Sequence, residues 1–582
     1  MGSLRFSYCD CSYILETDAR VLFFRAALAG CPPSKATQEE KMKSHHSFEE
    51  GLKALLIQAL ISCGFGDYQD CLSFEIPKES KFGDFSTNIA LRLSALTKDE
   101  PLKIAQALVD NLKPQLNKSS LAQDIQDIKN ACGFINFFLT PDYFYGQLKE
   151  IIEGGSDFAR QNLGKKKKVL IEFVSANPTG PLSVAHARQA VVGDVLANVL
   201  DFLGYCVKRE YYLNDEGNQI NILGNSIELR LKELCAEEIE FPENYYQGDY
   251  IYEIARKVKE AKIKNFSEYG VKYILNIIKK ELDDFGIRFD YWYSQKELRK
   301  SGKIKKVLDL IKQYLYEGEG ATWFKSTHFG DDKDRVVVKS DGAFTYLAPD
   351  IAYHYDKYKR GFTWLINLWG PDHHGYIPRL KAAVEALGKT PGSLSIIIVQ
   401  LASIFREGKA VEMSTRKGQY ITLREVLDEV GKDTARFFFL MRRTDSHLDF
   451  DLELAKRQTP ENPVYYVQYA HARICSIIGN AKKTDYKKAT ASLLKAEEEL
   501  KLIKRLSQFP YTLRIILRTL DPYSITAYLQ NLAADFHRFY DRHRVLGEDS
   551  DLTRSRLALI EATRIVLAGG LRLLGVAAPR KM

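Results

Sequence analysis

The sequence lacks any apolar run that approaches the length needed to cross a lipid bilayer. This absence predicts a soluble protein with no membrane partner. It also lacks a long segment of low hydrophobicity, because 45% of its residues are hydrophobic and 27% are charged, values that are typical of globular proteins. A long disordered tail is therefore excluded.

The pattern of cysteines and histidines argues against a disulfide-stabilised protein and against a metal-binding one. The nine cysteines form no Cys-x-x-Cys pair and no spacing typical of a disulfide framework, and their number is odd. These features predict free thiols in a reducing cytoplasm. The adjacent His373 and His374 raise the question of a metal site, but no second cluster of Cys, His or Asp stands at ligand spacing. We therefore expect no metal bound by the protein.

The chain is too long for one hydrophobic core, since 582 residues predict about three or four domains. Its formal net charge of +8 permits a polyanionic partner without requiring one. Residues 1–46 are interpreted as an N-terminal extension, or as the product of a start placed too early with Met42 as the true beginning. The other expected domains are an α+β domain over 47–145, an α/β domain over 165–432 with a helical insertion at about 222–318, and a helical domain over 433–582.

Residues 168–204 predict a buried strand, a tight turn and a long helix, in that order. The strand covers Val169–Val174, and Pro178 and Gly180 shape the turn. Apolar side chains then recur at steps of three and four residues, so that one face of the helix packs on a sheet. Such a turn places free backbone N–H groups at the carboxyl edge of the sheet, where a nucleotide phosphate binds. His186 lies in the first turn of this helix.

Beyond this helix, strands alternate with helices, which indicates a parallel sheet and an α/β fold class. Residues 222–318 are mostly helical and are interpreted as an insertion rather than as part of the sheet. Strand signals vanish from about residue 433, so the last part of the chain is predicted to be an all-α bundle. The expected strands cover 206–212, 335–339, 344–346, 364–369 and 395–400.

The first domain is predicted to mix helices with short strands. A helical pattern around Leu52–Leu60 leads to strand-like residues at 72–76, and the domain closes with the strand-like run Gly133–Leu139. Small α+β units of this kind are usually accessory, and simple packing is the ordinary explanation for their aromatic residues.

Four segments carry candidate functional residues, and each has an ordinary structural explanation when it is considered alone. His186 at a helix start is more often a cap or a packed side chain, although a turn shaped by Pro and Gly favours phosphate binding. Asp350 is most often an N-cap, but it stands with Tyr346 where a strand passes into a helix. Gly370–Gly375 follow an apolar strand, and Glu412–Gly418 form a basic loop. The order of the four segments is the informative feature.

This order resembles that of the class I aminoacyl-tRNA synthetases, in which a His-Ile-Gly-His motif follows the first strand and a Lys-Met-Ser-Lys-Ser loop follows the last. More narrowly, the chain from about residue 47 onward is similar to the arginyl-tRNA synthetases. The motifs that carry this resemblance are Ser175–Leu182, His186–Arg188, Gly193–Asp194, Tyr211–Asp215, Asp372–Gly375, Met413–Arg416 and the spacing of Gly431, Asp433 and Arg436. The resemblance implies a class I Rossmann-type catalytic domain with a helical insertion, an N-terminal α+β domain and a C-terminal all-α helical-bundle domain.

The resemblance also implies a two-step ligase reaction. The carboxylate of arginine attacks the α-phosphate of ATP with release of pyrophosphate, and the 2′-hydroxyl of the terminal adenosine of tRNA(Arg) then takes the aminoacyl group. ATP is expected as its Mg²⁺ complex, which needs no protein cage. The first step depends mainly on positioning and on neutralising phosphate charge.

By motif match, the expected site residues fall into three groups. Arginine recognition requires carboxylates and other acceptors, because a guanidinium offers five donors in a rigid fork. The residues implied in arginine binding are Glu172, Asn177, Tyr346, Asp350 and His373. Those implied in ATP binding are Ser183, Ala185, His186, Asp372, His373, Met413 and Ser414, and those implied in catalysis are His186, Ser183, Ser414, Arg416 and Lys417.

Two departures from the family's motifs affect the expected site. Ser183 and Ala185 stand where the family has its first histidine and its glycine, and a serine hydroxyl gives phosphate one hydrogen bond without a charge. Glu412 and Thr415 stand where the second motif usually has its two lysines. We therefore hypothesise that Arg416 or Lys417 supplies the missing positive charge.

In the family, both flanking domains bind tRNA. Phe134 and Asn136 match the N-terminal domain's contacts with the outer corner of the tRNA, one for stacking and one for hydrogen bonding. The contacts implied at the anticodon loop are Tyr466, Tyr469, Arg473 and Met582, of which the first three share one helical face. Packing is the competing explanation for the aromatic residues.

Three functions remain open on the sequence alone. The favoured one is an arginine–tRNA ligase that acts in the cytoplasm as a monomer, with no obligatory protein partner. A class I synthetase for another amino acid is less well supported, because the residues implied in arginine binding are all present. A tRNA-binding protein with a decayed active site is the third, and Ser183, Ala185 and Thr415 motivate it.

Overall fold

The structure is a computed structural model that describes residues 44–77, 79–411, 420–481, 485–486, 489–547 and 549–582. The chain divides into two compact units between Ala54 and Leu55, and helix α1 (Ser44–Ser62) runs across the division. Most of the expected extension over residues 1–46 lies outside the described residues. Among the helices that are described, none is both long and apolar enough to cross a membrane.

An antiparallel four-stranded sheet in the order β1-β2-β4-β3 follows α1. Its strands are β1 (Phe74–Glu75), β2 (Phe85–Thr87), β3 (Ile125–Ala131) and β4 (Phe134–Leu139), and its helices are α2 (Ile89–Thr97), α3 (Pro101–Leu116) and α4 (Pro141–Gly154). The α+β character and the strands near residues 74 and 134 are confirmed. Strand β3 escapes prediction because a bulge places its buried residues Ile125 and Ile128 three positions apart, which hides the two-residue period.

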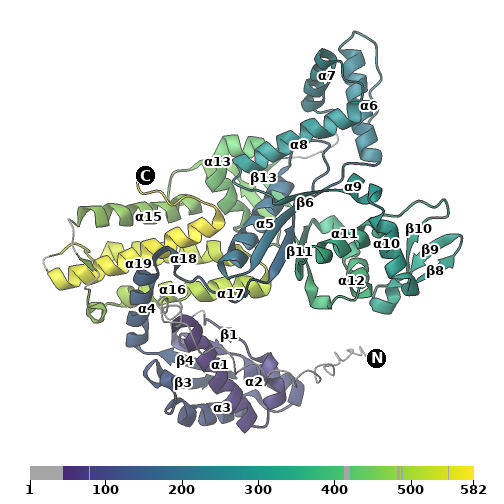
Figure 1. Cartoon of the computed structure of the whole chain (residues 1–582). Helices are drawn as coiled ribbons and strands as arrows, with labels where there is room; N and C mark the ends of the chain where they lie inside the picture. The colour runs from purple at the N-terminus through teal and green to yellow at the C-terminus, as the bar shows by residue number, and fades with distance from the viewer. Residues whose placement is uncertain (1–43, 78, 412–419, 482–484, 487–488, 548) are drawn as a thin grey trace, which may run out of the picture. The chain divides into compact units, whose positions relative to one another are not determined.

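Five parallel strands in the order β12-β11-β5-β6-β7 form the central sheet (Figure 1). They are β5 (Lys168–Glu172), β6 (Cys206–Leu213), β7 (Tyr291–Ser294), β11 (Trp364–Trp369) and β12 (Leu394–Ile398). In chain order, β5 comes first and lies in the middle of the sheet, β6 and β7 follow on one side, and β11 and β12 follow on the other. This doubly wound, Rossmann-type order confirms the predicted α/β class. It also places a topological switch point between β5 and β11, where ligands of such sheets bind.

Helix α5 (Val184–Phe202) follows β5, as expected, and packs very closely on the segment beyond that strand. A Cβ atom added at Gly193 would lie 2.3 Å from the ring of Phe173. Only a glycine allows this approach, so Gly193 sets the distance between the helix and the sheet.

Gly193→Ala is expected to destabilise the protein by about 1–3 kcal/mol, because overpacking forces side chains and backbone apart. Urea unfolding followed by circular dichroism measures this change. Gly479→Ala is the matched control, since Gly479 also lies in a helix and has no atom within 4 Å of its added Cβ. Equal stability of the two variants would contradict the packing argument.

The stretch 222–318 is mostly helical, as predicted, and its longer helices are α6 (Asn218–Glu233), α7 (Asp249–Ala261) and α8 (Phe266–Asp284). The prediction that it contributes nothing to the sheet is wrong, because β7 pairs with β6 at the sheet edge. A four-residue edge strand rich in aromatic residues gives little periodic signal. Helices α9 (Gln295–Lys300) and α10 (Lys303–Leu310) follow it.

Two other expected strands do not belong to the central sheet. Strand β10 (Arg335–Val338) pairs instead with β9 (Ala321–Phe324), which pairs with β8 (Leu315–Gly318), in a separate antiparallel sheet. Residues 344–346 form only an isolated bridge between Val338 and Phe344 before α11 (Leu347–Lys359) begins. Short apolar runs fit either kind of sheet, so the sequence does not indicate which one they join.

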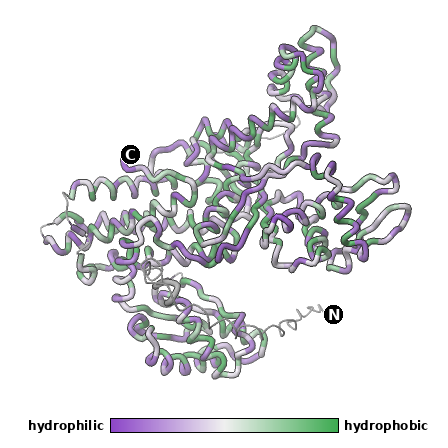
Figure 2. The backbone as a smooth tube through the Cα atoms, viewed as in Figure 1, coloured by the Kyte–Doolittle hydropathy of each residue, from purple (hydrophilic) through white to green (hydrophobic). Residues whose placement is uncertain are grey.

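A third small sheet contains β13 (Ala402–Arg406), β14 (Lys409–Ala410) and β15 (Leu448–Asp451). Strand β15 corrects the prediction that strands end at residue 433, and the all-α part begins after it. Its helices are α14 (Leu452–Lys456), α15 (Pro463–Asn480), α16 (Glu497–Ser507), α17 (Phe509–Thr519), α18 (Tyr523–Arg542) and α19 (Ser550–Leu574). Hydrophobic and hydrophilic residues alternate along these helices (Figure 2), as expected for a packed bundle.

Candidate active site

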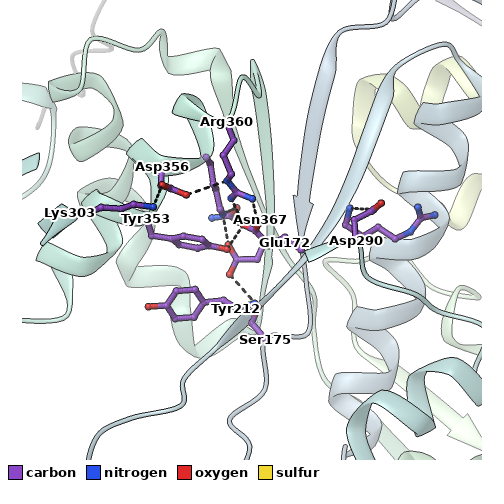
Figure 3. A network of polar contacts seen from close by, with 12 residues as sticks. Glu172, Ser175, Tyr212, Asp290, Lys303, Tyr353, Asp356, Arg360 and Asn367 are labelled. Atoms are coloured by element: carbon purple, nitrogen blue, oxygen red, sulfur yellow. Dashed lines mark hydrogen bonds and ion pairs between the residues drawn. The ribbon is translucent and has the colours of Figure 1, made fainter. Parts of the chain in front are cut away.

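Three polar residues stand side by side across the centre of the sheet. Asn367 on β11, Glu172 on β5 and Glu210 on β6 are in register, and all three are buried. Two carboxylates inside a parallel sheet require cations nearby. Helix α11 and its C-cap supply them: Lys357 Nζ lies 2.5 Å from Glu172, and Arg360 donates to both oxygens of Glu210 at 2.5 and 2.9 Å. Figure 3 labels Glu172, Asn367 and Arg360 in this network.

The backbone immediately after β5 is strained. Val174 and Ser175 have φ values of 67° and 41°, a left-handed conformation that is rare for a β-branched residue. Hydrogen bonds hold this turn: Ser175 Oγ donates to Glu172 Oε1 at 3.2 Å and accepts from the N–H of Tyr212 at 3.1 Å. Strain of this kind gathers at ligand sites. Ser175 therefore orients the Glu172 carboxylate, a role that its place in the motif did not reveal.

Asn177 lies in the same turn and is held at both ends of its amide. Its Oδ1 accepts a hydrogen bond from Asn214 Nδ2 at 2.7 Å, and its Nδ2 donates to Gln219 Oε1 at 2.6 Å. The sequence places Asn214 in a family motif but gives no role to it or to Gln219. The two side chains fix the orientation of the Asn177 amide beside the carboxyl end of β5.

Asp350 lies in the first turn of α11 and is partly buried. Tyr376 donates a hydrogen bond to its carboxylate at 2.6 Å. Burial raises the pKa of Asp350 to about 7, and the charge of Glu172 adds to the rise, while Tyr376 and Lys357 oppose it. The sequence analysis missed Tyr376, which directly follows the predicted motif that ends at Gly375. Tyr346, just before α11, is 83% exposed and thus accessible to a ligand.

Ser183 and His186 form one hydrogen-bonded unit at the start of α5. The N–H of Ser183 donates to His186 Nδ1 at 3.2 Å, and Ser183 Oγ lies 3.0 Å from the same nitrogen. Because Nδ1 accepts, the ring proton of the neutral imidazole is on Nε2. Burial lowers the pKa of His186 to about 4, although Asp372 opposes this change. His186 is therefore neutral at pH 7 and offers one N–H donor.

Main-chain hydrogen bonds hold residues 421–423 against the start of α5. Ser183 and Thr422 form an antiparallel bridge. The N–H of Leu423 donates to the carbonyl of Leu182 at 2.7 Å, and the N–H of Val184 donates to the carbonyl of Ile421 at 3.3 Å. Residues 421–423 therefore lie directly against the start of α5. The predicted site residues Met413, Ser414, Arg416 and Lys417 lie outside the described residues.

Asp372 and His373 follow β11, at the other side of the switch point. Their side chains are 76% and 59% exposed, and the carboxylate lies 3.4 Å from the imidazole Nε2. Both can therefore reach a ligand at the carboxyl edge of the sheet. Within the described part of the chain, no group of three His, Cys, Asp or Glu side chains is arranged to hold a metal ion.

Two further family motifs each contain a buried arginine that holds distant segments together. Arg188 and Arg436 are both fully buried, and Arg436 donates to Asp194 at 2.5 Å. Gly575 leaves room for Arg436, since an added Cβ would lie 2.4 Å from its guanidinium. Arg188 donates to the carbonyls of Gln400, Leu401, Arg443 and Ser446. Both side chains join distant segments of the chain.

The expected tRNA contacts belong to other elements of the chain than the site residues. Phe134 is partly exposed, whereas Asn136 is only 2% exposed. In the helical part, Tyr466 and Tyr469 on α15 lie 4.6 and 5.8 Å from the ring of His537 on α18. Arg473 donates to the hydroxyl of Tyr540 at 2.7 Å, and Met582 is exposed. His537 and Tyr540 extend this aromatic face beyond the residues that the sequence indicated.

Three family models match successive parts of the chain. They describe an arginyl tRNA synthetase N terminal domain (residues 50–139), a class I (R) tRNA synthetase catalytic domain (147–448) and a DALR anticodon binding domain (467–582). The arginine–tRNA ligase of Citrifermentans bemidjiense is 46% identical over 559 residues, which cover 92% of this chain and 100% of that protein. The chain belongs to the arginyl-tRNA synthetase family. The arginine–tRNA ligase of Bacillus subtilis is 42% identical over 564 residues, or 93% of this chain and 100% of that protein.

A solved arginyl-tRNA synthetase from Thermus thermophilus shares the fold, with a TM-score of 0.74 and 21% identity over 92% of this chain and 100% of that one. The family resemblance and the three-part fold class read from the sequence are therefore confirmed. As a member of this family, the chain is an aminoacyl-tRNA ligase of class I. The roles of individual residues stay predictions.

Proposed function

We propose that this arginine–tRNA ligase binds its two small substrates at the switch point between β5 and β11. The observation that carries the proposal is the bridge between Ser183 and Thr422, which holds the segment after residue 419 against the start of α5. Beside them lie the carboxylates of Glu172 and Asp350. The α-carboxylate of arginine attacks the α-phosphorus of ATP, the bond to pyrophosphate breaks, and the 2′-hydroxyl of tRNA(Arg) then displaces AMP from the adenylate.

Glu172 and Asp350 bind the guanidinium of arginine, with Asn177, Tyr346 and His373 around it. Carboxylates match the rigid fork of guanidinium donors. Neutral amino acids are rejected because they would leave the ionised carboxylate of Asp350 without a cationic partner. The two carboxylates of the pocket belong to Glu172 and Asp350, and the strained turn at Ser175 fixes that of Glu172.

The specificity constant for arginine is expected to rise between pH 6 and about pH 8. The ionised form of Asp350 attracts the guanidinium, and this carboxyl group loses its proton near its pKa of about 7. Below that pKa, each unit of pH changes the ionised fraction by up to about tenfold. Steady-state charging at saturating ATP and tRNA measures the profile. Tyr376→Phe removes a hydrogen bond that lowers the pKa of Asp350, so it should move the inflection to higher pH; a flat wild-type profile would contradict this role.

ATP binds at the start of α5. Three groups face the phosphates: the helix N-terminus, the Nε2–H donor of His186 and the hydroxyl of Ser183. Ala185 adds only a methyl group in this turn. Asp372 and His373 lie across the switch point. Mg²⁺ accompanies ATP as a complex with the phosphates, which needs no protein cage.

The loop with Met413 and Ser414 contributes the remaining positive charge. Either Arg416→Ala or Lys417→Ala is expected to reduce the rate of adenylate formation by about tenfold or more, because one of these cations replaces the family's missing lysine. Pre-steady-state measurement of adenylate formation tests this. Unchanged rates in both variants would refute the assignment.

The flanking domains bind tRNA(Arg). Phe134 and Asn136 are the proposed contacts at the outer corner of the tRNA. The face formed by Tyr466, Tyr469 and Arg473, with Met582, is proposed to hold the anticodon loop, since aromatic and arginine side chains stack on unpaired bases. We propose that the enzyme acts as a cytoplasmic monomer. The six described cysteines, all of them free thiols, are consistent with that compartment.

Charging of purified tRNA with radioactive amino acids tests the proposed function. Arginine, but not lysine or glutamine, is expected to become acid-precipitable on tRNA(Arg) in the presence of ATP and Mg²⁺. Tight tRNA binding without charging would favour the alternative of a catalytically inactive tRNA-binding protein. No finding on the described residues favours that alternative.

A further inference from the structure

Lys357 is the only lysine among the described residues that is fully buried and paired with a site carboxylate. Its Nζ lies 2.5 Å from Glu172 Oε2, 3.2 Å from Asn367 Oδ1 and 4.1 Å from the centre of the Tyr353 ring. An ammonium group has three N–H donors. Two of them reach side-chain oxygens and the ammonium group lies over an aromatic ring, so Lys357 is held from three directions.

This position determines the orientation of the next two side chains. Because Asn367 Oδ1 accepts from Lys357, its Nδ2 faces His354 and donates to Nε2 at 2.8 Å. The other ring nitrogen of His354 must then carry the proton, and it lies 2.8 Å from the backbone carbonyl of Asp350. Burial, together with the charge of Lys357, lowers the pKa of His354 well below its usual value, so the ring stays neutral. One directed relay thus links the two carboxylate positions.

The relay also balances charge in the pocket. Lys357 already neutralises Glu172, so only Asp350 contributes an uncompensated negative charge when it is ionised. One net negative charge matches the single positive charge of a guanidinium. Without Lys357, two carboxylates would face the same space, and a buried carboxylate without its counter-ion either moves or takes up a proton.

We propose that Lys357, Asn367 and His354 are positioning residues for arginine: Lys357 fixes and neutralises Glu172, and the relay holds the turn of α11 that carries Asp350. This inference rests on the proposed function, in which Glu172 and Asp350 bind the guanidinium. It adds a resident cation to a site that must bind a cationic substrate. Lys357 acts through Glu172 and does not touch the reacting atoms.

The same helix provides a matched comparison for Lys357. Lys303 on α10 pairs with Asp356 of α11, 2.5 Å apart, but its side chain is 46% exposed and the pair makes no contact with Glu172 or Asn367 (Figure 3). A lysine-to-methionine change there also removes one positive charge that is paired with α11. It leaves the relay intact.

The test compares Lys357→Met with Lys303→Met in full-length protein, by measuring KM for arginine, KM for ATP and the rate of tRNA charging. Lys357→Met is expected to raise KM for arginine at least tenfold and to change KM for ATP less than twofold. Lys303→Met should leave both constants unchanged. Lys357→Gln, which keeps a donor for Glu172 without the charge, should give an intermediate KM for arginine and decides the matter if the methionine variant does not fold.

A double variant separates positioning from general stability. If Lys357 acts through Glu172, adding Lys357→Met to Glu172→Gln should raise KM for arginine less than twofold further, since residues in one network are not additive. An unchanged or lower KM for arginine in folded Lys357→Met, or equal losses for arginine and ATP, would overturn the inference while leaving the ligase function intact. Failure of the wild-type protein to charge tRNA with arginine would refute the proposed function instead.

Discussion

Asp350→Asn is expected to reduce the specificity constant for arginine by about 10²- to 10³-fold. Removing one charged partner of a desolvated pair costs about 2–5 kcal/mol, and each 1.4 kcal/mol is a factor of ten. The asparagine keeps the size of the side chain and still meets the Tyr376 hydroxyl, so the loss isolates the charge. The effect should fall mainly on KM for arginine, measured by charging at saturating ATP and tRNA.

Asp356→Asn is the matched control for this variant. Asp356 lies on the same helix, and its partners are Lys303 and Arg360 rather than a substrate. We expect its KM for arginine to stay within threefold of the wild-type value. A KM for arginine that is equally unchanged in Asp350→Asn would remove Asp350 from the arginine site.

His186→Ala is expected to lower the rate of adenylate formation by about 10²- to 10³-fold with little change in KM for arginine. A donor aimed at developing phosphate charge contributes most in the transition state, and losing one costs about this much. Since the pKa of His186 is about 4, the imidazole stays neutral throughout the working range, so His186 itself should produce no pH dependence above pH 6. Single-turnover adenylate formation at several pH values measures both expectations.

The control for His186 is His328→Ala. His328 stacks on Tyr314, far along the chain from either motif, and has an exposed ring. Its loss should change the rate of adenylate formation less than twofold. A His186→Ala variant that forms adenylate at the wild-type rate would show that the helix N-terminus suffices without the imidazole.

The sequence predicts the central part of the fold well because its signals there are local. The strand that begins at Val169 is a nearly continuous apolar run, and the helix that ends near Leu203 repeats apolar residues at steps of three and four. A glycine and prolines mark the turn between them. The weaker predictions concern pairing between distant segments. Strand β10 has the same apolar character as a strand of the central sheet, and only its partner β9 distinguishes the two cases.

The site shows the same limit at the level of side chains. Motif positions identify Glu172, Asp350 and His186, but the groups that orient them come from other elements. Lys357 lies 185 residues from Glu172, and Tyr376 lies 26 residues from Asp350. No period or spacing in one sequence connects such pairs, so the counter-ion and the relay become visible only in three dimensions.

Exchange of radioactive pyrophosphate into ATP is the most direct test of the central account. Purified protein with Mg²⁺ would be assayed with arginine alone, with tRNA(Arg) alone and with both. Arginyl enzymes resemble the glutamyl and glutaminyl ones in requiring tRNA for activation, so we expect exchange only when arginine and tRNA(Arg) are both present. No exchange under any condition, despite tight binding of tRNA(Arg), would contradict the account.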